Sequence, residues 1–391
     1  MDECTDLTKG SSASMSPDRP TGRPTSRNPG GLTFIPRSCT THVSVRRLPW
    51  DDLPRVPLAP LPSPLVHAPR FSAAIGAEVW IKRDDIGSLT HAGNKIRKLE
   101  FLLGQALADG VNLVVTIGAQ QSNSVRAAAA ACAQLGIRCS AIVTGERPPW
   151  ITANLLLEHL VGAEIRYLGS HDWRTLEAAM RTAVTEFERA GHRVLGLPVG
   201  GSMPLGAVGF AAAYVELVDQ LDSYGVDAEL LVHASCTGGT QAGLEVGRRL
   251  LGRGPRVVGI GVAKGLGDVA SFARLATEAS AILGAPISWA EDEFDLDQGF
   301  MGSAYGVPTP EALEAIDLLA RSEGIIVDPV YSGKGLAGLI GRVRDDAVEG
   351  PVVFWHTGGA QVVFEPELSK TLLGQGVGLE EVGSRSSVDL L

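Results

Sequence analysis

The chain has 391 residues, of which 45% are hydrophobic and 20% charged, so it can bury a core of the size that globular enzymes have. Its net charge of −10 argues against nucleic acid or an anionic membrane surface as a partner. No apolar run reaches the roughly 18 residues of a membrane-spanning helix, and the histidines show no metal-ligand spacing, so we predict no metal site. The five cysteines form no CxxC pair, which favours a reduced, cytoplasmic setting.

Residues 1–45 differ in composition from the rest of the chain. Ser, Thr, Pro, Gly and Arg dominate, and apolar periodicity is missing. Such a segment buries too little apolar surface to offset the entropy of ordering it, so we predict a disordered extension. It lacks the continuous apolar stretch of a signal peptide, and a transit peptide or a misassigned start codon are the alternatives. From Pro49 to Pro64 the prolines recur too often for a helix or central strand, which predicts extended chain.

The stretch from Lys82 to Arg126 brings a lysine close to an anion-binding turn. Lys95 ends the sequence HAGNK and directly precedes an amphipathic helix. A buried-type strand at 113–117 then leads into the turn at 118–124, which opens an alanine-rich helix. The first turn of a helix has unpaired N–H groups, so this turn can bind an anion to which Lys95 presents an amine.

The chain alternates short buried strands with helices of about ten residues or more. Strands separated by such helices form βαβ units, so the pattern predicts an α/β fold with a parallel sheet. We predict strands at 78–82, 113–117, 141–144, 164–168, 193–197, 229–234, 256–262, 324–327 and 351–355, and helices at 70–75, 124–135, 151–161, 173–190, 207–222, 241–251, 267–283 and 310–323, with a further helix that ends at 343.

The loop SCTGGT at 235–240 lies between a predicted strand and a predicted helix. Successive backbone N–H groups and the helix dipole can cradle a phosphate there, since glycines let the backbone approach and Thr237 and Thr240 add donors. The loop lacks the lysine of a P-loop and the GxGxxG spacing of a dinucleotide fold. Taken alone, it is more typical of a tight turn than of a phosphate site.

Seven short sequence motifs are distinctive: IKRDD, GNKIRKLEFLL, GAQQSN, PVGGS, the loop at 235–240, DPVYSGK and HTGG. Together they resemble the ACC deaminase / D-cysteine desulfhydrase family of pyridoxal-phosphate enzymes, from about Leu53 to about Leu373. The resemblance implies the tryptophan synthase β-like fold of type II, which is α/β with two open, mostly parallel twisted sheets flanked by helices and the cofactor in the interdomain cleft. It also implies a homodimer, a larger domain of residues 46–95 plus 206–375, a smaller domain of residues 96–205, and a loose tail at 376–391.

The resemblance assigns roles to residues of this chain. Lys95 is expected to hold pyridoxal 5′-phosphate covalently and to act as base at the substrate Cα, and Asn123 to hydrogen-bond the phenolic oxygen of the cofactor. Met203 and Ser124 depart from the residues usual in the family. The expected catalytic residues are Lys95, Ser122, Tyr305 and Tyr331; the cofactor-binding residues are Lys95, Asn123, Thr237, Gly238, Gly239, Thr240, Ser332 and Thr357; the substrate-binding residues are Ser122, Asn123, Ser124, Tyr305 and Tyr331.

We therefore expect a lyase that catalyses α,β-elimination on a small amino acid with a β leaving group. D-cysteine, giving pyruvate, ammonia and sulfide, is the best match. Family members that act as ACC deaminases have Glu and Leu where this chain has Ser332 and Thr357, which favours the desulfhydrase side. An ACC deaminase, a cysteate sulfo-lyase, a β/γ-replacement enzyme of secondary metabolism and a cofactor-binding protein without turnover are the alternatives.

Overall fold

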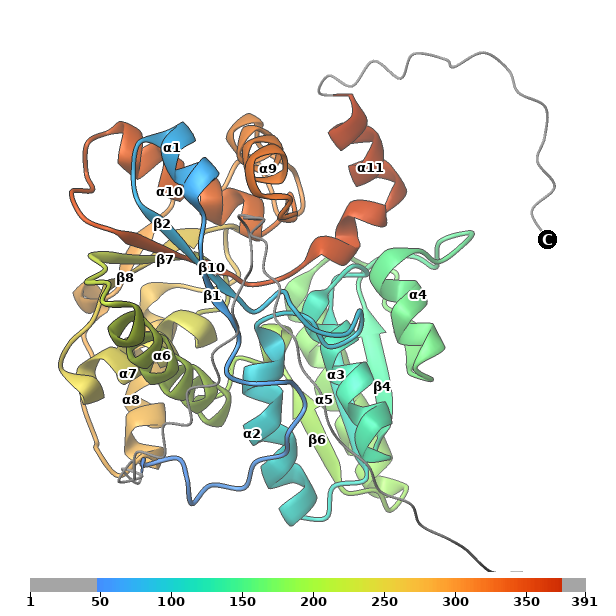
Figure 1. The fold of residues 1–391 in the computed structure, drawn as a ribbon. Coiled ribbons are helices and arrows are strands. Elements are labelled where there is room, and N and C mark those ends of the chain that lie inside the picture. The colour runs from blue at the N-terminus through green and yellow to red at the C-terminus, as the bar shows by residue number, and fades with distance from the viewer. Residues whose placement is uncertain (1–47, 375–391) are drawn as a thin grey trace, which may run out of the picture. The chain divides into compact units, whose positions relative to one another are not determined.

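The computed structural model describes residues 48–374, which fall within one compact unit that begins at Leu48 (Figure 1). The predicted disordered extension and C-terminal tail lie outside the described residues. Two separate sheets organise the described chain, one of six strands and one of four. The predicted fold class is confirmed, because both sheets are mostly parallel and helices flank them.

The larger sheet combines strands from both ends of the chain. Every neighbouring pair is parallel except the first, in which β1 runs antiparallel to β2 at the edge. Its strands, in spatial order, are β1 (Leu65–His67), β2 (Val79–Arg83), β10 (Val352–His356), β7 (Leu230–Ser235), β8 (Arg256–Gly261) and β9 (Asp295–Asp297).

The smaller sheet is entirely parallel, and its central strand shows the period-2 alternation that places helices on both faces. Val114 packs with α2 and α3, whereas Leu113, Val115 and Ile117 pack on the opposite face with α5. In spatial order the strands are β5 (Glu164–Tyr167), β4 (Arg138–Val143), β3 (Leu113–Gly118) and β6 (Val194–Leu197).

Helices cover both faces of each sheet. On the larger sheet, α1, α9 and α10 pack on one face, while α6 and α7 pack on the other. The helices are α1 (Pro69–Ile75), α2 (Lys95–Ala108), α3 (Asn123–Leu135), α4 (Ala153–Leu160), α5 (Trp173–Arg189), α6 (Pro204–Tyr224), α7 (Gly239–Leu251), α8 (Val269–Ile282), α9 (Pro310–Glu323), α10 (Ser332–Arg344) and α11 (Pro366–Leu373), with short 3₁₀ turns at Val199–Gly201, Glu291–Glu293 and Ala360–Phe364.

Helix α2 lies between the two halves of the fold, packed against α6 on one side and α3 on the other (Figure 1). Small residues allow this close approach. A Cβ on Gly209 of α6 would lie 2.1 Å from the carbonyl oxygen of Arg97, so the two helix backbones touch at a position that only glycine fits. Glycine at position 209 therefore allows the close contact between α6 and α2.

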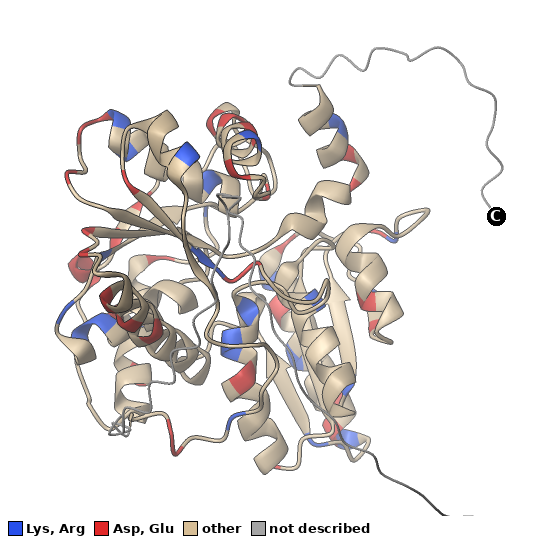
Figure 2. Ribbon diagram, in the orientation of Figure 1, with Lys and Arg blue, Asp and Glu red and all other residues tan. Residues whose placement is uncertain are grey.

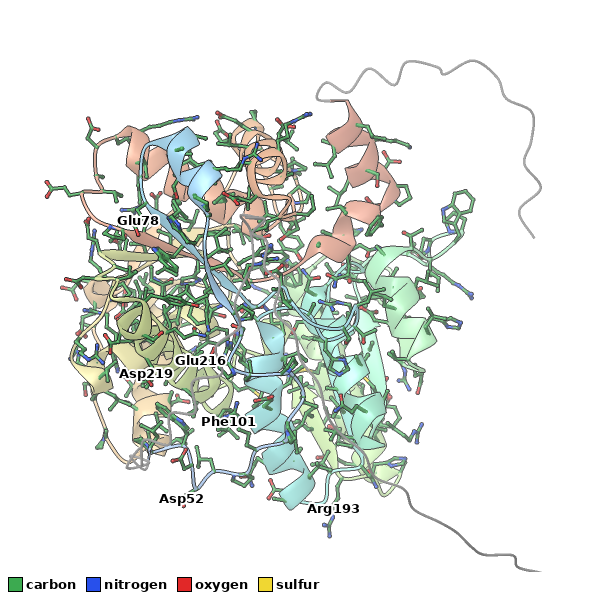
Figure 3. The ribbon with its side chains drawn as sticks, in the orientation of Figure 1. Asp52, Glu78, Phe101, Arg193, Glu216 and Asp219 are labelled. Carbon is green, nitrogen blue, oxygen red and sulfur yellow. The ribbon has the colours of Figure 1, made fainter. Side chains whose placement is uncertain are left out.

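A buried ion-pair cluster holds α2 to the larger sheet. Arg97 Nη2 lies 2.8 Å from Asp84 Oδ1 and 2.9 Å from Glu216 Oε1, and Lys82 Nζ also donates to Glu216. Figure 3 labels Glu216, which belongs to α6. The indole of Trp355 donates to Asp84 Oδ2 at 2.8 Å. Figure 2 shows the basic residues of α2 in the middle of the fold. Removing one partner of such a cluster leaves a buried charge uncompensated, which costs roughly 3–5 kcal/mol.

The structure corrects one predicted strand. Residues 324–327 follow α9 in an extended course but form no strand within the described chain. The carbonyl of Ile326 accepts from the ring of His356, and the N–H of Asp328 donates to Ser332 Oγ. Within this run, a side chain rather than a neighbouring strand thus pairs the Ile326 carbonyl. Strands β1 and β9 and helix α11, which the sequence analysis did not predict, complete the fold.

Candidate active site

A cavity surrounds the side chain of Lys95 between the two sheets. It brings together all of the predicted catalytic and substrate-binding residues, which come from distant parts of the chain. Its lining consists of Lys95, Gly118, Ala119, Ser122, Asn123, Ser124, Trp173, Val199, Gly200, Cys236, Thr237, Leu266, Tyr305 and Tyr331. Of the predicted site residues, Gly238, Gly239, Thr240, Ser332 and Thr357 do not border this cavity.

Lys95 is the first residue of α2, and its amine is enclosed by protein. Nζ donates to Asn94 Oδ1 at 3.0 Å. Burial lowers the pKa of Lys95 to about 8, and the nearby guanidinium of Arg126 acts in the same direction. A substantial share of the amine is therefore neutral near pH 8, which is the form that can attack an aldehyde carbonyl.

The first turn of α3 presents Ser122, Asn123 and Ser124 to the cavity. Ser122 is the N-cap, and its Oγ accepts from the N–H of Val125 at 3.3 Å. Asn123 Oδ1 accepts from Asn154 Nδ2 at 2.9 Å, so the Asn123 amide is oriented with its own Nδ2 free to donate elsewhere. Asn154 is fully buried at the start of α4, and sequence analysis did not identify it.

The loop at 235–240 forms the N-terminus of α7, as a phosphate-binding loop would. Gly238 is the N-cap in the left-handed region, at φ +81°, where other residues are strained. A Cβ on Gly239 would lie 2.8 Å from Ser202 Oγ and 2.9 Å from Lys98 Nζ, so the backbone approaches both groups closely. Thr240 Oγ1 accepts from Asn94 Nδ2 at 3.2 Å, which connects this loop to the residue before Lys95.

Lys98 is a second buried amine that sequence analysis missed. Its Nζ donates to the carbonyl of Gly200 at 3.2 Å and to Ser202 Oγ at 3.5 Å. Burial, reinforced by the positive charge of Lys95, holds the pKa of Lys98 well below its usual range. The sequence signal that could have identified Lys98 is its spacing from Lys95. Residues three apart on a helix share a face, and Lys98 lies one turn after Lys95. An anion at the start of α7 would meet this amine.

Tyr305 and Tyr331 meet through their hydroxyls, which are hydrogen-bonded to each other. Burial raises the pKa of both phenols above the usual value, so both hydroxyls stay protonated at neutral pH. The indole of Trp173 packs edge-on against Tyr305, with ring centroids 5.6 Å apart. The cavity therefore holds two neutral hydroxyl groups beside a buried lysine.

Ser332 and Thr357 are buried and do not border the cavity. The hydroxyl of Ser332 donates to Asp328 Oδ2 at 2.5 Å and accepts from the Asp328 N–H at 2.8 Å. The Asp328 carboxylate also accepts from the backbone N–H groups of Val330, Tyr331 and Ser332 at the start of α10. The Asp328 carboxylate is thus engaged with the helix N-terminus, and the Ser332 side chain beside it is a neutral hydroxyl that is fully buried.

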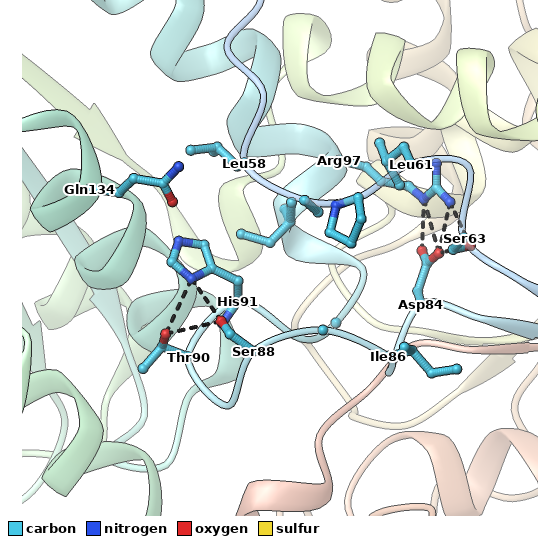
Figure 4. A pocket seen from close by; sticks show the side chains of 15 residues that line it. Leu58, Leu61, Ser63, Asp84, Ile86, Ser88, Thr90, His91, Arg97 and Gln134 are labelled. Atoms are coloured by element: carbon cyan, nitrogen blue, oxygen red, sulfur yellow. Dashed lines mark hydrogen bonds and ion pairs between the residues drawn. The ribbon is translucent and has the colours of Figure 1, made fainter. Parts of the chain in front are cut away.

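A larger cavity of about 380 Å³ opens between residues 58–63, the loop at 84–93 and α2 (Figure 4). It contains the Arg97–Asp84 pair and the imidazole of His91, whose Nδ1 lies 3.1 Å from Ser88 Oγ. Lys95 does not border it, and none of the predicted site residues does. Although this cavity is the larger of the two, we do not take it as the candidate active site, because it lacks the predicted site residues.

Comparisons with known proteins show which family and which fold the chain resembles. The family model described as "Pyridoxal-phosphate dependent enzyme" matches residues 56–358. The D-cysteine desulfhydrase of Salmonella typhi is 38% identical over 323 residues, which is 80% of this chain and 95% of that protein. A crystal structure of an ACC deaminase homologue superposes with a TM-score of 0.77 at 34% identity, covering 83% of this chain and 97% of the other. A fungal L-serine ammonia-lyase from Rhizomucor miehei, at 18% identity and a TM-score of 0.57, covers 80% of this chain and 98% of its own and shares the fold.

Proposed function

The chain belongs to the family of pyridoxal-phosphate-dependent enzymes, and on that premise we propose that it eliminates sulfide from D-cysteine to give pyruvate and ammonia. The observation that carries the proposal is the 38% identity to a D-cysteine desulfhydrase across 95% of that protein. The buried lysine and the two protonated phenols in one cavity are the groups that such an elimination requires.

The residues around the cavity fit pyridoxal 5′-phosphate. Lys95 offers a buried amine of lowered pKa for covalent attachment of the aldehyde. Gly238, Gly239 and the first turn of α7, with Lys98 beside them, offer N–H groups and a cation for the phosphate. The Asn123 amide, oriented by Asn154, offers a donor for the phenolic oxygen. When bound, the cofactor supplies an electron sink for the pair released from the substrate Cα–H bond.

Lys95 Nζ is the proposed base that removes the Cα proton. Its lowered pKa keeps the proton affinity of the amine close to the working pH, where a general base is most effective. The substrate carboxylate would lie at the start of α3, where Ser122 and Ser124 border the cavity and the first-turn N–H groups point outward. In this pose the Cα would lie between the amine and the anion site.

Tyr305 and Tyr331 are proposed to assist the departing sulfur. Because their hydroxyls are hydrogen-bonded to each other, one phenol can donate a proton to sulfur while the other stabilises the phenolate that forms. The C–S bond then breaks with sulfide leaving in protonated form. The three-carbon enamine that remains hydrolyses to pyruvate and ammonia.

We further propose that the enzyme is a cytoplasmic homodimer and that it divides into the two domains expected from the family resemblance. The described free cysteines Cys132 and Cys139 are buried thiols, which suits a reducing compartment. Over residues 48–374, no helix has the length and apolar character needed to cross a membrane. Sedimentation of the purified chain measures the oligomeric state directly.

The direct test of the function is a comparison of D- and L-cysteine as substrates of the cofactor-loaded enzyme. We expect pyruvate and sulfide in equal amounts from D-cysteine, with kcat/KM at least about tenfold above that for L-cysteine. Pyruvate is measured by coupled reduction and sulfide by colorimetry. L-cysteine as the better substrate, or cofactor binding without product from any amino acid, would refute the assignment.

Asn154 provides a test of the cofactor orientation. Asn154→Asp removes the Nδ2 donor to Asn123 and replaces it with an acceptor, so the Asn123 amide should turn and withdraw its own donor from the cavity. A hydrogen bond to a charged group is worth about 1.5–3 kcal/mol, so we expect cofactor affinity to fall by ~10-fold or more. Equilibrium dialysis measures it. Asn112→Asp is the control, because Asn112 precedes β3 far from the cavity and its Oδ1 acceptor role is kept. Equal retention in both variants would show that Asn154 does not orient Asn123.

A further inference from the structure

We propose that Trp173 sets the upper size of the amino-acid side chain that this enzyme accepts. The proposal rests on the proposed function in one respect, since it takes the cavity beside Lys95 as the place where the amino acid binds. Trp173 is neither a base nor a proton donor in the proposed reaction. Its indole acts only by occupying space.

Trp173 begins α5 and is held in place at that position. Asp172 caps the helix, with Oδ2 accepting from the N–H of Thr175 at 2.8 Å and from its hydroxyl at 2.6 Å. The indole reaches from the smaller sheet's side of the cavity to Tyr305, which it meets edge-on with the ring planes at 88°. A tryptophan fixed at its backbone by a cap and at its ring by a neighbour makes a rigid wall.

The indole separates the cavity beside Lys95 from two outer hollows. The inner cavity encloses about 30 Å³, and the outer hollows enclose about 530 Å³ and about 780 Å³. Among the described residues, Trp173 alone borders all three. One outer hollow adjoins Thr237 and α8, and the other adjoins Tyr305, Tyr331 and the start of α11.

The other residues that line both the inner cavity and one of the outer hollows either have smaller side chains than Trp173 or take part in the proposed chemistry. Towards the first hollow, the inner cavity shares Val199, Thr237 and Leu266, of which Thr237 belongs to the proposed phosphate loop. Towards the second, it shares Tyr305, Tyr331 and Ala119; the tyrosines are proposed proton donors and the alanine is small. Trp173 is therefore the large side chain whose removal would join the three spaces without altering the proposed chemistry.

A size limit of this kind should be visible in binding, independently of elimination. Each methylene that fits or does not fit an apolar pocket changes discrimination by about 10–200-fold. Alanine, 2-aminobutyrate, norvaline and phenylalanine form a ladder of increasing side-chain size, and none carries a β leaving group. Their affinities can be read from the absorption change of the cofactor-loaded enzyme, and the ladder is run with both the D- and the L-series.

In the wild type we expect affinity to fall at least ~10-fold between 2-aminobutyrate and phenylalanine in the preferred series. Trp173→Ala should raise phenylalanine affinity at least ~10-fold and leave alanine within about threefold of wild type. Trp173→Phe should give affinities for the four amino acids that lie between those of the wild type and those of Trp173→Ala. If Trp173→Ala fails to hold the cofactor, Trp173→Phe is the variant that tests the proposal. Trp150→Ala is the matched control, because Trp150 is 71% exposed and borders none of the three spaces. That variant should reproduce the wild-type ladder.

The proposal would be overturned if both Trp173 variants bound the four amino acids with wild-type affinities. It would also be overturned if the wild type bound phenylalanine with the same affinity as 2-aminobutyrate. Failure of the proposed function looks different. D-cysteine would then give no sulfide in any variant, while the binding ladder would still report whether Trp173 limits side-chain size.

Discussion

Replacing Lys95 with alanine is expected to abolish both turnover and the visible absorption of covalently attached cofactor. Lys95 is the buried amine in the cavity that Ser122, Tyr305 and Tyr331 also line, and its pKa is lowered to about 8 mainly by burial. Loss of a general base alone costs roughly 10²–10⁴ in rate. Because the same amine is proposed to anchor the cofactor, we expect activity with D-cysteine to fall below detection.

Absorption spectroscopy and reduction with borohydride measure the attachment, since reduction makes the bond to the lysine permanent and a peptide map then locates it. Lys98→Ala is the informative comparison. Lys98 is also buried but faces Gly200, Ser202 and the start of α7, so this variant should keep the absorption and retain the cofactor less tightly. Lys370→Ala, at an exposed residue of α11, should behave as wild type. A permanent adduct in Lys95→Ala would assign the anchor elsewhere.

Discrimination between D-cysteine and 1-aminocyclopropane-1-carboxylate is the second large effect that we expect. The wild type should eliminate sulfide from D-cysteine and form 2-oxobutyrate from the cyclopropane at a rate at least ~10²-fold lower. The magnitude follows because one electrostatic contact to developing charge is worth roughly 10²–10³ in rate. Opening a cyclopropane breaks a carbon–carbon bond without a good leaving group, so it demands a deep electron sink. Thiolate departs as a stable anion and demands less.

The structure supports this expectation through Ser332 and Asp328. Ser332 presents a hydroxyl whose proton is donated to Asp328, and the Asp328 carboxylate is itself satisfied by three backbone N–H groups. No unpaired carboxylate is offered at this position, and Thr357 adds a second neutral side chain. A carboxylate there would hold a protonated pyridine nitrogen, whereas a hydroxyl cannot neutralise one.

Parallel assays of pyruvate and 2-oxobutyrate measure the discrimination, with β-chloro-D-alanine as a substrate whose leaving group needs no protonation. Activity on β-chloro-D-alanine shows that the loaded enzyme is competent even where D-cysteine turns over slowly. Vigorous 2-oxobutyrate formation with D-cysteine inert would place this chain with the deaminases. The structural similarity to an ACC deaminase homologue makes this the comparison to perform first.

The sequence by itself was enough for the elements whose signal is local. The buried strand at 113–117, the turn after it and the helix capped by Ser122 were all predicted, and the structure has them as β3 and α3. Periodicity and capping act over a few residues, so they survive whatever the rest of the chain does. Lys95 was predicted from the resemblance of its GNK motif to the family, and the structure has it in the lining of the cavity.

Only the tertiary structure decided which distant residues serve the cavity. Lys98 meets a carbonyl 102 residues away, and Asn154 orients an amide 31 residues before it. The extended run at 324–327 forms no strand in the described chain, and its Ile326 carbonyl is paired with the ring of His356, 30 residues away. Trp173 reads in the sequence as an ordinary first residue of a helix, and its position beside Tyr305 follows from how α5 packs on the smaller sheet. Such contacts depend on long-range packing, which periodicity and turn chemistry within one segment do not specify.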